Sequence, residues 1–174
     1  MMKKQKNAII AAAFMTLAAS SAWAGDKSRA CTPKDLAGIW EMKSMTGETK
    51  KVNPSDPFLS PYQRFRFTAD GKMTHMVARR PIAGDPTLES LIENTLLLST
   101  YNLDPKGVLT VFKIESSNPE KCLCTYLLAD PPAEKLAQLP PEKRAMVPTK
   151  GDVMLTYLSA DGRTLVGKTL KKIK

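Results

Sequence analysis

The sequence predicts an all-β fold: about eight antiparallel strands, consecutive in the chain, that close into an up-and-down barrel with one or two short helices. Most of the chain after residue 25 divides into short segments in which apolar and polar residues alternate, as in half-buried strands. Turn-forming residues separate these segments, and the turn Ala-Asp-Gly occurs twice, at 69–71 and 160–162. An antiparallel set of this size most easily removes its exposed edges by closing on itself.

The expected elements follow in chain order. Thr32 caps one helical turn that begins at Pro33, and Asp85 with Pro86 starts a short helix that ends near Asn94. Residues 46–61 are rich in Gly, Pro, Asn and Ser and are expected to form a loop. The eight strands are expected at 36–42, 62–68, 72–79, 96–103, 108–115, 121–128, 152–159 and 163–171.

The hairpin at 62–79 fixes which side chains point into the barrel. A three-residue turn that ends at Gly71 places Thr68 opposite Lys72. Because neighbouring residues of a strand point to opposite faces, this register separates apolar from charged side chains. The inward set is Phe65, Phe67, Met73, His75 and Val77, and the outward set is Arg64, Arg66, Lys72 and Thr74.

Residues 1–24 have the three parts of a secretory signal peptide. A basic start precedes an apolar run at 7–19, and Ala22-Trp23-Ala24 supplies the small residues that a signal peptidase reads. We therefore expect cleavage between Ala24 and Gly25. The apolar run is shorter than the about 20 residues of a membrane-spanning helix. The expected product is a single soluble domain, residues 25–174, in the periplasm of a Gram-negative bacterium or otherwise secreted.

The charge of the chain is carried mainly by this exported part. The whole chain of 174 residues has a formal charge of +9, and removal of residues 1–24 leaves 23 basic and 17 acidic side chains, or +6. Export and the lack of interleaved exposed aromatics exclude a nucleic-acid partner. The outward residues Arg64, Arg66 and Lys72 suit an anionic envelope surface or an acidic partner, and the simpler interpretation is a solvated face. Further lysines crowd the C-terminus: Lys168, Lys171, Lys172 and Lys174.

Three cysteines enter an oxidising compartment. Cys122 and Cys124 flank one residue of a strand, so their Cα atoms are roughly 6.6 Å apart with parallel Cβ vectors, which disfavours a bond between them. We expect Cys31 to pair with Cys122 or Cys124, closing a loop of about 90 residues that stabilises the fold by roughly 4 kcal/mol. The remaining thiol is a buried spectator, a reactive group or the bridge of a disulfide-linked dimer; otherwise the chain is a monomer.

Gly38-Ile39-Trp40 follows a helical turn and begins the first expected strand. This segment resembles the G-x-W signature of lipocalins and related calycin barrels, and the later layout is similar to bacterial lipocalin-like proteins of unassigned function. The resemblance implies that Trp40 packs at the barrel bottom. The T-D-Y motif of lipocalins is absent, and the arginine that covers their tryptophan has no clear match; Lys171 and Lys172 are the candidates to stack there.

The resemblance also implies a small apolar ligand inside the barrel. An eight-stranded barrel holds either packed side chains or one small molecule. The alternative is therefore a ligand-free barrel that acts as a protein-interaction or envelope-associated module. The candidate lining residues are Phe65, Phe67, Met73, His75 and Tyr101.

Other chemistry has less support in the sequence. Met73-Thr74-His75-Met76 and Cys122-Leu123-Cys124 offer soft ligands for Cu(I), but Met76 points away from Met73 and His75. No nucleophile stands beside a base in a recognisable motif, so we expect no catalytic residues, no metal and no cofactor. Residues 129–151 contain five prolines and one expected helical turn at 134–139, and this long insert is a candidate lid or partner surface.

Overall fold

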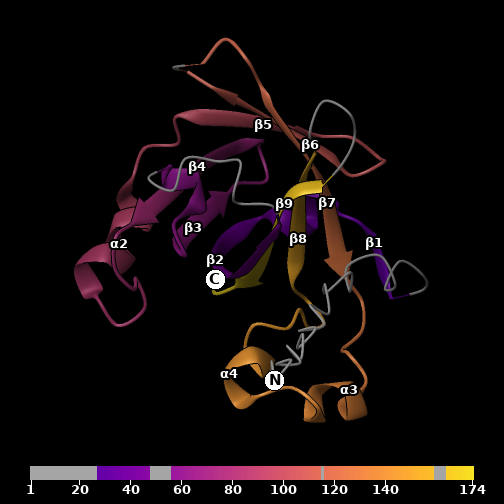
Figure 1. Cartoon of the computed structure of the whole chain (residues 1–174). Coiled ribbons are helices and arrows are strands. Elements are labelled where there is room, and N and C mark those ends of the chain that lie inside the picture. Colours follow the sequence, from indigo (N-terminus) through magenta and orange to yellow (C-terminus); the bar gives the residue numbers. More distant parts are fainter. Residues whose placement is uncertain (1–26, 48–55, 115, 159–163) are drawn as a thin grey trace, which may run out of the picture.

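The computed structural model describes residues 27–47, 56–114, 116–158 and 164–174. Within them, eight antiparallel strands form a closed barrel and one further strand is added, so the predicted fold class is confirmed (Figure 1). The predicted signal peptide and its cleavage point between Ala24 and Gly25 lie outside the described residues, as does the turn at 160–162. None of the described helices has both the length and the apolar character needed to cross a bilayer.

Nine strands and five short helical segments make up the described chain. The strands are β1 (Ser28–Ala30), β2 (Gly38–Gly47), β3 (Tyr62–Phe67), β4 (Lys72–Ala78), β5 (Ser99–Leu103), β6 (Val108–Lys113), β7 (Glu120–Leu127), β8 (Val153–Leu158) and β9 (Thr164–Lys172). The helices are α1 (Pro33–Leu36), η2 (Pro57–Leu59), α2 (Pro86–Asn94), α3 (Ala133–Ala137) and α4 (Pro141–Arg144). All eight predicted strands are present, with ends shifted by up to five residues.

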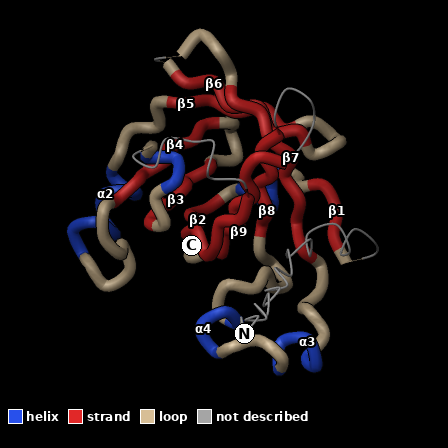
Figure 2. The backbone as a smooth tube through the Cα atoms, viewed as in Figure 1, coloured by secondary structure: helices blue, strands red, loops and turns tan. Residues whose placement is uncertain are grey.

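The barrel closes between its first and last strands. Strands β2 to β9 pair in chain order, and β2 also pairs with β9 from Trp40 opposite Lys172 to Gly47 opposite Val166. The predicted hairpin register is confirmed, because Phe65 lies opposite His75 and Phe67 opposite Met73. Figure 2 shows the strands enclosing the interior while the helices lie outside or at the ends.

The short strand β1 is the one strand that the sequence pattern did not predict. It pairs with residues 125–127 of β7, on the edge that β6 occupies at 120–123. Directly after β1, Cys31 forms a disulfide with Cys124, with a Cα–Cα distance of 5.4 Å and a sequence separation of 93. Of the two predicted partners of Cys31, the structure thus has Cys124 and not Cys122. The bond links the N-terminal arm to β7.

The Gly38-Ile39-Trp40 segment packs one part of the core. Trp40 is fully buried, and its Nε1 donates a hydrogen bond of 2.7 Å to the carbonyl oxygen of Leu36 at the end of α1. The Lys172 Nζ lies 5.6 Å from the centre of the Trp40 ring, as expected for one of the two candidate lysines. Gly38 has φ +134°, and a Cβ there would lie 2.3 Å from the carbonyl oxygen of Lys174. Only glycine therefore fits this close approach of the two chain segments.

Two peripheral segments differ from the simple barrel. Helix α2, capped by Asp85 as predicted, packs over the outer face of β3 and β4 with Ile92 buried (Figure 1). The insert 129–151 forms α3 and α4, where one helical turn was predicted, and its ends are joined by a hydrogen bond of 2.9 Å from the Lys150 amide to Asp130 Oδ1. The insert lies beyond one end of β7 and β8 and does not cover the interior (Figure 1).

Candidate functional site

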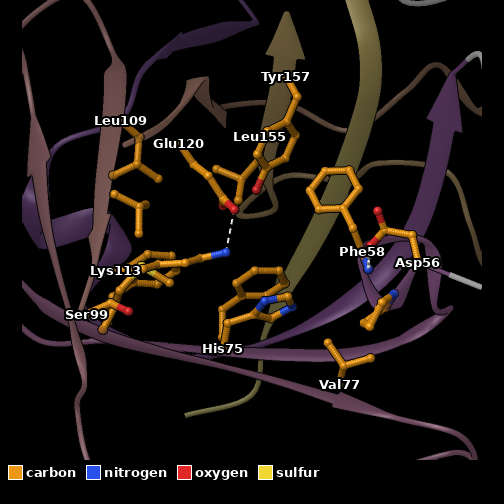
Figure 3. A pocket seen from close by; sticks show the side chains of 15 residues that line it. Asp56, Phe58, His75, Val77, Ser99, Leu109, Lys113, Glu120, Leu155 and Tyr157 are labelled. Atoms are coloured by element: carbon orange, nitrogen blue, oxygen red, sulfur yellow. Dashed lines mark hydrogen bonds and ion pairs between the residues drawn. The ribbon is translucent and has the colours of Figure 1, made fainter. Parts of the chain in front are cut away.

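The barrel contains a cavity of about 410 Å³. Figure 3 shows its lining side chains, which come from η2 and from β3 to β8 and converge on one space. The lining is mainly apolar, and two of its polar side chains, those of Lys113 and Glu120, are partly exposed. The lining residues are Asp56, Pro57, Phe58, Phe65, Phe67, Met73, His75, Val77, Ser99, Leu109, Val111, Lys113, Glu120, Leu155 and Tyr157.

Strand alternation builds the apolar part of this cavity. Phe65 and Phe67 point inward from β3, and their rings are nearly parallel with centres 6.3 Å apart. The His75 ring stacks on Phe65 at 4.3 Å. Leu109 and Leu155 enter from β6 and β8 and are each 1% exposed. The hydrophobic side of each strand therefore faces a common space that the side chains do not fill.

A buried polar cluster stands against this apolar lining. Gln63 is fully buried on β3, and its Nε2 donates to the carbonyl oxygens of Phe58 and Ser60 at 2.9 and 2.5 Å. These two bonds orient the amide, so Gln63 Oε1 is the acceptor for Lys168 Nζ at 2.8 Å and for His75 Nε2 at 3.0 Å.

Lys168 is the cation of this cluster. Lys168 is 1% exposed, and its Nζ lies 3.5 Å from the centre of the Phe58 ring and 5.5 Å from the centre of the Tyr157 ring. Burial lowers the pKa of Lys168 from 10.5 to about 8, so the amine is still mostly charged at neutral pH. Among the described residues, no carboxylate oxygen lies within ion-pair distance of it.

His75 is held neutral beside this lysine. Burial, together with the positive charges of Lys168 and Lys113, lowers the pKa of His75 to about 3. Since Gln63 Oε1 accepts a hydrogen bond from Nε2, the proton of the neutral ring is on Nε2 and Nδ1 carries the lone pair. The neutral imidazole of His75 therefore lines the cavity, and the buried cation Lys168 lies close by, bound to the same Gln63 oxygen, without lining it.

The exposed side of the cavity carries an ion pair. Lys113 Nζ contacts Glu120 Oε1, and both side chains are partly exposed (Figure 3). Asp56 accepts a hydrogen bond of 2.8 Å from the Phe58 amide and so caps η2. The two carboxylates that flank the cavity are thus engaged by groups other than Lys168.

The structure brings four of the five predicted lining residues together. Phe65, Phe67, Met73 and His75 line the cavity, and Tyr101 does not. Tyr101 is buried with its ring edge-on to Phe67, and its hydroxyl donates to the carbonyl oxygen of Thr68 at 2.8 Å. Burial raises the pKa of the Tyr101 hydroxyl. Its hydroxyl group thus stabilises the turn after β3.

The basic outer face is smaller than the sequence pattern suggested. Arg64 points outward, as predicted, but it is buried beside α2 and its Nη2 lies 2.5 Å from Glu41 Oε2. Arg66 donates to the Glu93 carbonyl oxygen at 2.5 Å, and the exposed Lys72 lies 3.0 Å from Asp70. The assignment of Lys168 to the basic C-terminal surface is wrong, because it alternates inward with its buried neighbours on β9.

Sequence reasoning missed three residues of the site: Phe58, Gln63 and Lys168. Phe58 falls in the segment expected to be a loop, where η2 forms. Gln63 shares the inward parity of Phe65 and Phe67, and Lys168 shares that of Val166 and Leu170. The alternation of inward and outward side chains along each strand could therefore have predicted that Gln63 and Lys168 point inward. For Lys168, the general rule that lysine lies on surfaces favoured the opposite orientation.

The two cysteines of β7 differ in their bonding state. Cys124 is committed to the disulfide with Cys31, so Cys122-Leu123-Cys124 does not offer two thiolates to Cu(I). Cys122 is free and buried, and burial raises its pKa to about 12. Among the residues that the structure describes, no three His, Cys, Asp or Glu side chains gather as a metal site.

The chain matches no protein-family model, no curated protein and no solved structure. The cavity and its buried polar cluster are therefore the observations from which function is inferred.

Proposed function

We propose that this protein is an exported binding protein that holds one small apolar molecule in the barrel cavity. The observation that carries the proposal is a cavity of about 410 Å³ lined mostly by aromatic and aliphatic side chains. Small-molecule sites have volumes of roughly 300–1,000 Å³ and are lined mainly by apolar groups with a few polar ones. A barrel packed for stability alone has few voids larger than a water molecule.

The geometry around Trp40 supports a lipocalin-like classification within this proposal. A closed up-and-down barrel, Gly38 at a close approach and Lys172 beside the buried indole agree with the resemblance seen in the sequence. The Cys31–Cys124 disulfide supports export, because such bonds persist in oxidising compartments.

Binding without catalysis is part of the same proposal. The low pKa of His75 makes its imidazole a weak base, and the high pKa of Cys122 keeps that group a thiol rather than a nucleophilic thiolate. Neither group is prepared for proton abstraction or nucleophilic attack near neutral pH.

The proposal is tested with N-phenyl-1-naphthylamine, a neutral apolar fluorophore that brightens when water is excluded. Val77 lines the cavity and is half-buried, so Val77→Trp places an indole in the space that a ligand needs. Leu123→Trp is the matched control, since Leu123 is exposed on the outside of β7. Circular dichroism spectra verify that each variant is folded.

Wild-type protein and Leu123→Trp are expected to bind one fluorophore with similar affinity, and Val77→Trp to bind at least tenfold more weakly. Absence of saturable binding to folded wild-type protein overturns the proposal. Equal binding by Val77→Trp does so as well, because the fluorophore then sits elsewhere.

A further inference from the structure

Lys168 is a buried cation that has no carboxylate within ion-pair distance among the described residues. Its Nζ donates one hydrogen bond, to Gln63 Oε1, and faces the Phe58 ring, whereas an ammonium group has three protons to donate. A buried charge is costly unless it is paired and fully hydrogen-bonded. The interior of the barrel therefore contains a strong donor that the described chain satisfies only in part.

The surrounding groups do not supply the missing partner. Glu120 on β7 pairs with Lys113 on β6, and Asp56 caps η2. Gln63 Oε1 is shared between Lys168 and His75, and its Nε2 is occupied by two carbonyl oxygens. The other titratable groups near Lys168 are the neutral side chains of Cys122 and Tyr157.

The position of Phe58 connects this amine to the cavity. The Phe58 ring lines the cavity on one side and stands 3.5 Å from Lys168 Nζ. It belongs to the three-residue helix η2 and is half-buried. Because Lys168 does not itself line the cavity, a ligand there reaches Nζ only if a side chain between them, such as that of Phe58, rotates.

We propose that the ligand is an amphipathic monocarboxylate whose carboxylate pairs with Lys168 and whose apolar part fills the remaining cavity. This inference rests on the proposed function, because it assigns a polar end to the molecule that occupies the same space. A carboxylate accepts the protons that Gln63 leaves unused, and its negative charge neutralises the buried ammonium. The apolar lining, from Phe67 to Leu155, receives the rest of the ligand.

The test compares decanoate with 1-decanol, which share an alkyl chain and differ in the charged end. Their dissociation constants are measured by calorimetry at pH 7 for wild-type protein and for Lys168→Met, which keeps the length of the side chain and removes its charge. Lys113→Met is the matched control, because Lys113 is a second nearby cation and does line the cavity.

Wild-type protein is expected to bind decanoate at least tenfold more tightly than 1-decanol. Lys168→Met is expected to lose that preference while it still binds 1-decanol, and Lys113→Met to retain it. The inference is overturned if wild-type protein shows no preference, or if the preference persists in Lys168→Met. Failure of both compounds to bind wild-type protein overturns the proposed function instead.

A pH series keeps the inference falsifiable if Lys168→Met does not fold. The decanoate preference of wild-type protein should fall progressively as pH rises above about 8, where Lys168 loses its charge. The other groups that face Lys168 are His75 from β4, Lys113 from β6, Glu120 and Cys122 from β7, Tyr157 from β8 and Asp56 before η2. A preference that stays constant from pH 7 to pH 10 contradicts the role of Lys168.

Discussion

Replacing Lys168 with methionine should stabilise the protein at neutral pH, and the gain should disappear at alkaline pH. The pKa of Lys168 is about 8 in the folded chain, against an ordinary value of 10.5. At about 1.4 kcal/mol for each tenfold change in the proton equilibrium, the charged amine destabilises the folded state by about 3 kcal/mol. Below pH 8 this full cost applies.

The sign of the pH effect follows from proton counting. Between pH 8 and pH 10.5 the unfolded chain binds more protons at Lys168 than the folded chain, so folding becomes more favourable as pH rises. Methionine has no proton to lose. The stability advantage of Lys168→Met over wild-type protein should therefore shrink by about 3 kcal/mol between pH 7 and pH 10.5.

Urea denaturation of both proteins at pH 7, 8, 9 and 10.5 measures this difference. Lys106→Met is the control, because Lys106 is exposed in the turn between β5 and β6. The difference between Lys106→Met and wild-type protein gives the effect of removing an exposed lysine at each pH. A pH-independent difference between wild-type protein and Lys168→Met would refute the reasoning, because the amine would then titrate as it does in water.

Four further substitutions test the framework around the cavity. Cys31→Ser removes a disulfide with a sequence separation of 93 and should lower the free energy of unfolding by about 4 kcal/mol. Cys122→Ala removes a free thiol and should lower it by about 1 kcal/mol. Thermal unfolding of the two variants measures this difference. Gly38→Ala should cost more than about 1 kcal/mol, since its Cβ clashes with a backbone oxygen, and unchanged stability in urea would contradict this. Trp40→Phe leaves the Leu36 carbonyl oxygen without its donor and should cost about 2 kcal/mol, measured by the same urea titration.

Local patterns were sufficient to predict the barrel. The turn at Ala69-Asp70-Gly71 sets the pairing of β3 with β4, and a shift of one residue would have put Phe65 and Phe67 outside. The alternation of side chains along a strand also predicted that both cysteines of β7 share one face, and each of them is buried. These features depend on neighbours in sequence and on the two-residue period of a strand, so the chain specifies them locally.

The polar part of the site could not be predicted in the same way. Lys168 is fixed inward by pairing with Leu155 on the neighbouring strand β8 and with Met45 on β2, which is far away in sequence. The barrel interior tolerates the amine of Lys168 because this amine donates to Gln63 and faces the Phe58 ring. Phe58 comes from a segment with no strand pattern. Strand β1 was missed because three residues are too few to show alternation. Long-range packing decides these features.

An apolar molecule is expected to bind inside the barrel, and the methionine methyl groups report on this binding directly. Met73 lines the cavity, whereas Met76 on the same strand lies opposite the outward-facing Arg64. In a protein labelled with ¹³C at its methionine methyl groups, titration with 1-decanol should shift the Met73 signal to saturation and leave Met76 unchanged. A Met73 signal that does not move at saturating 1-decanol, or moves no more than Met76, would contradict an occupied cavity.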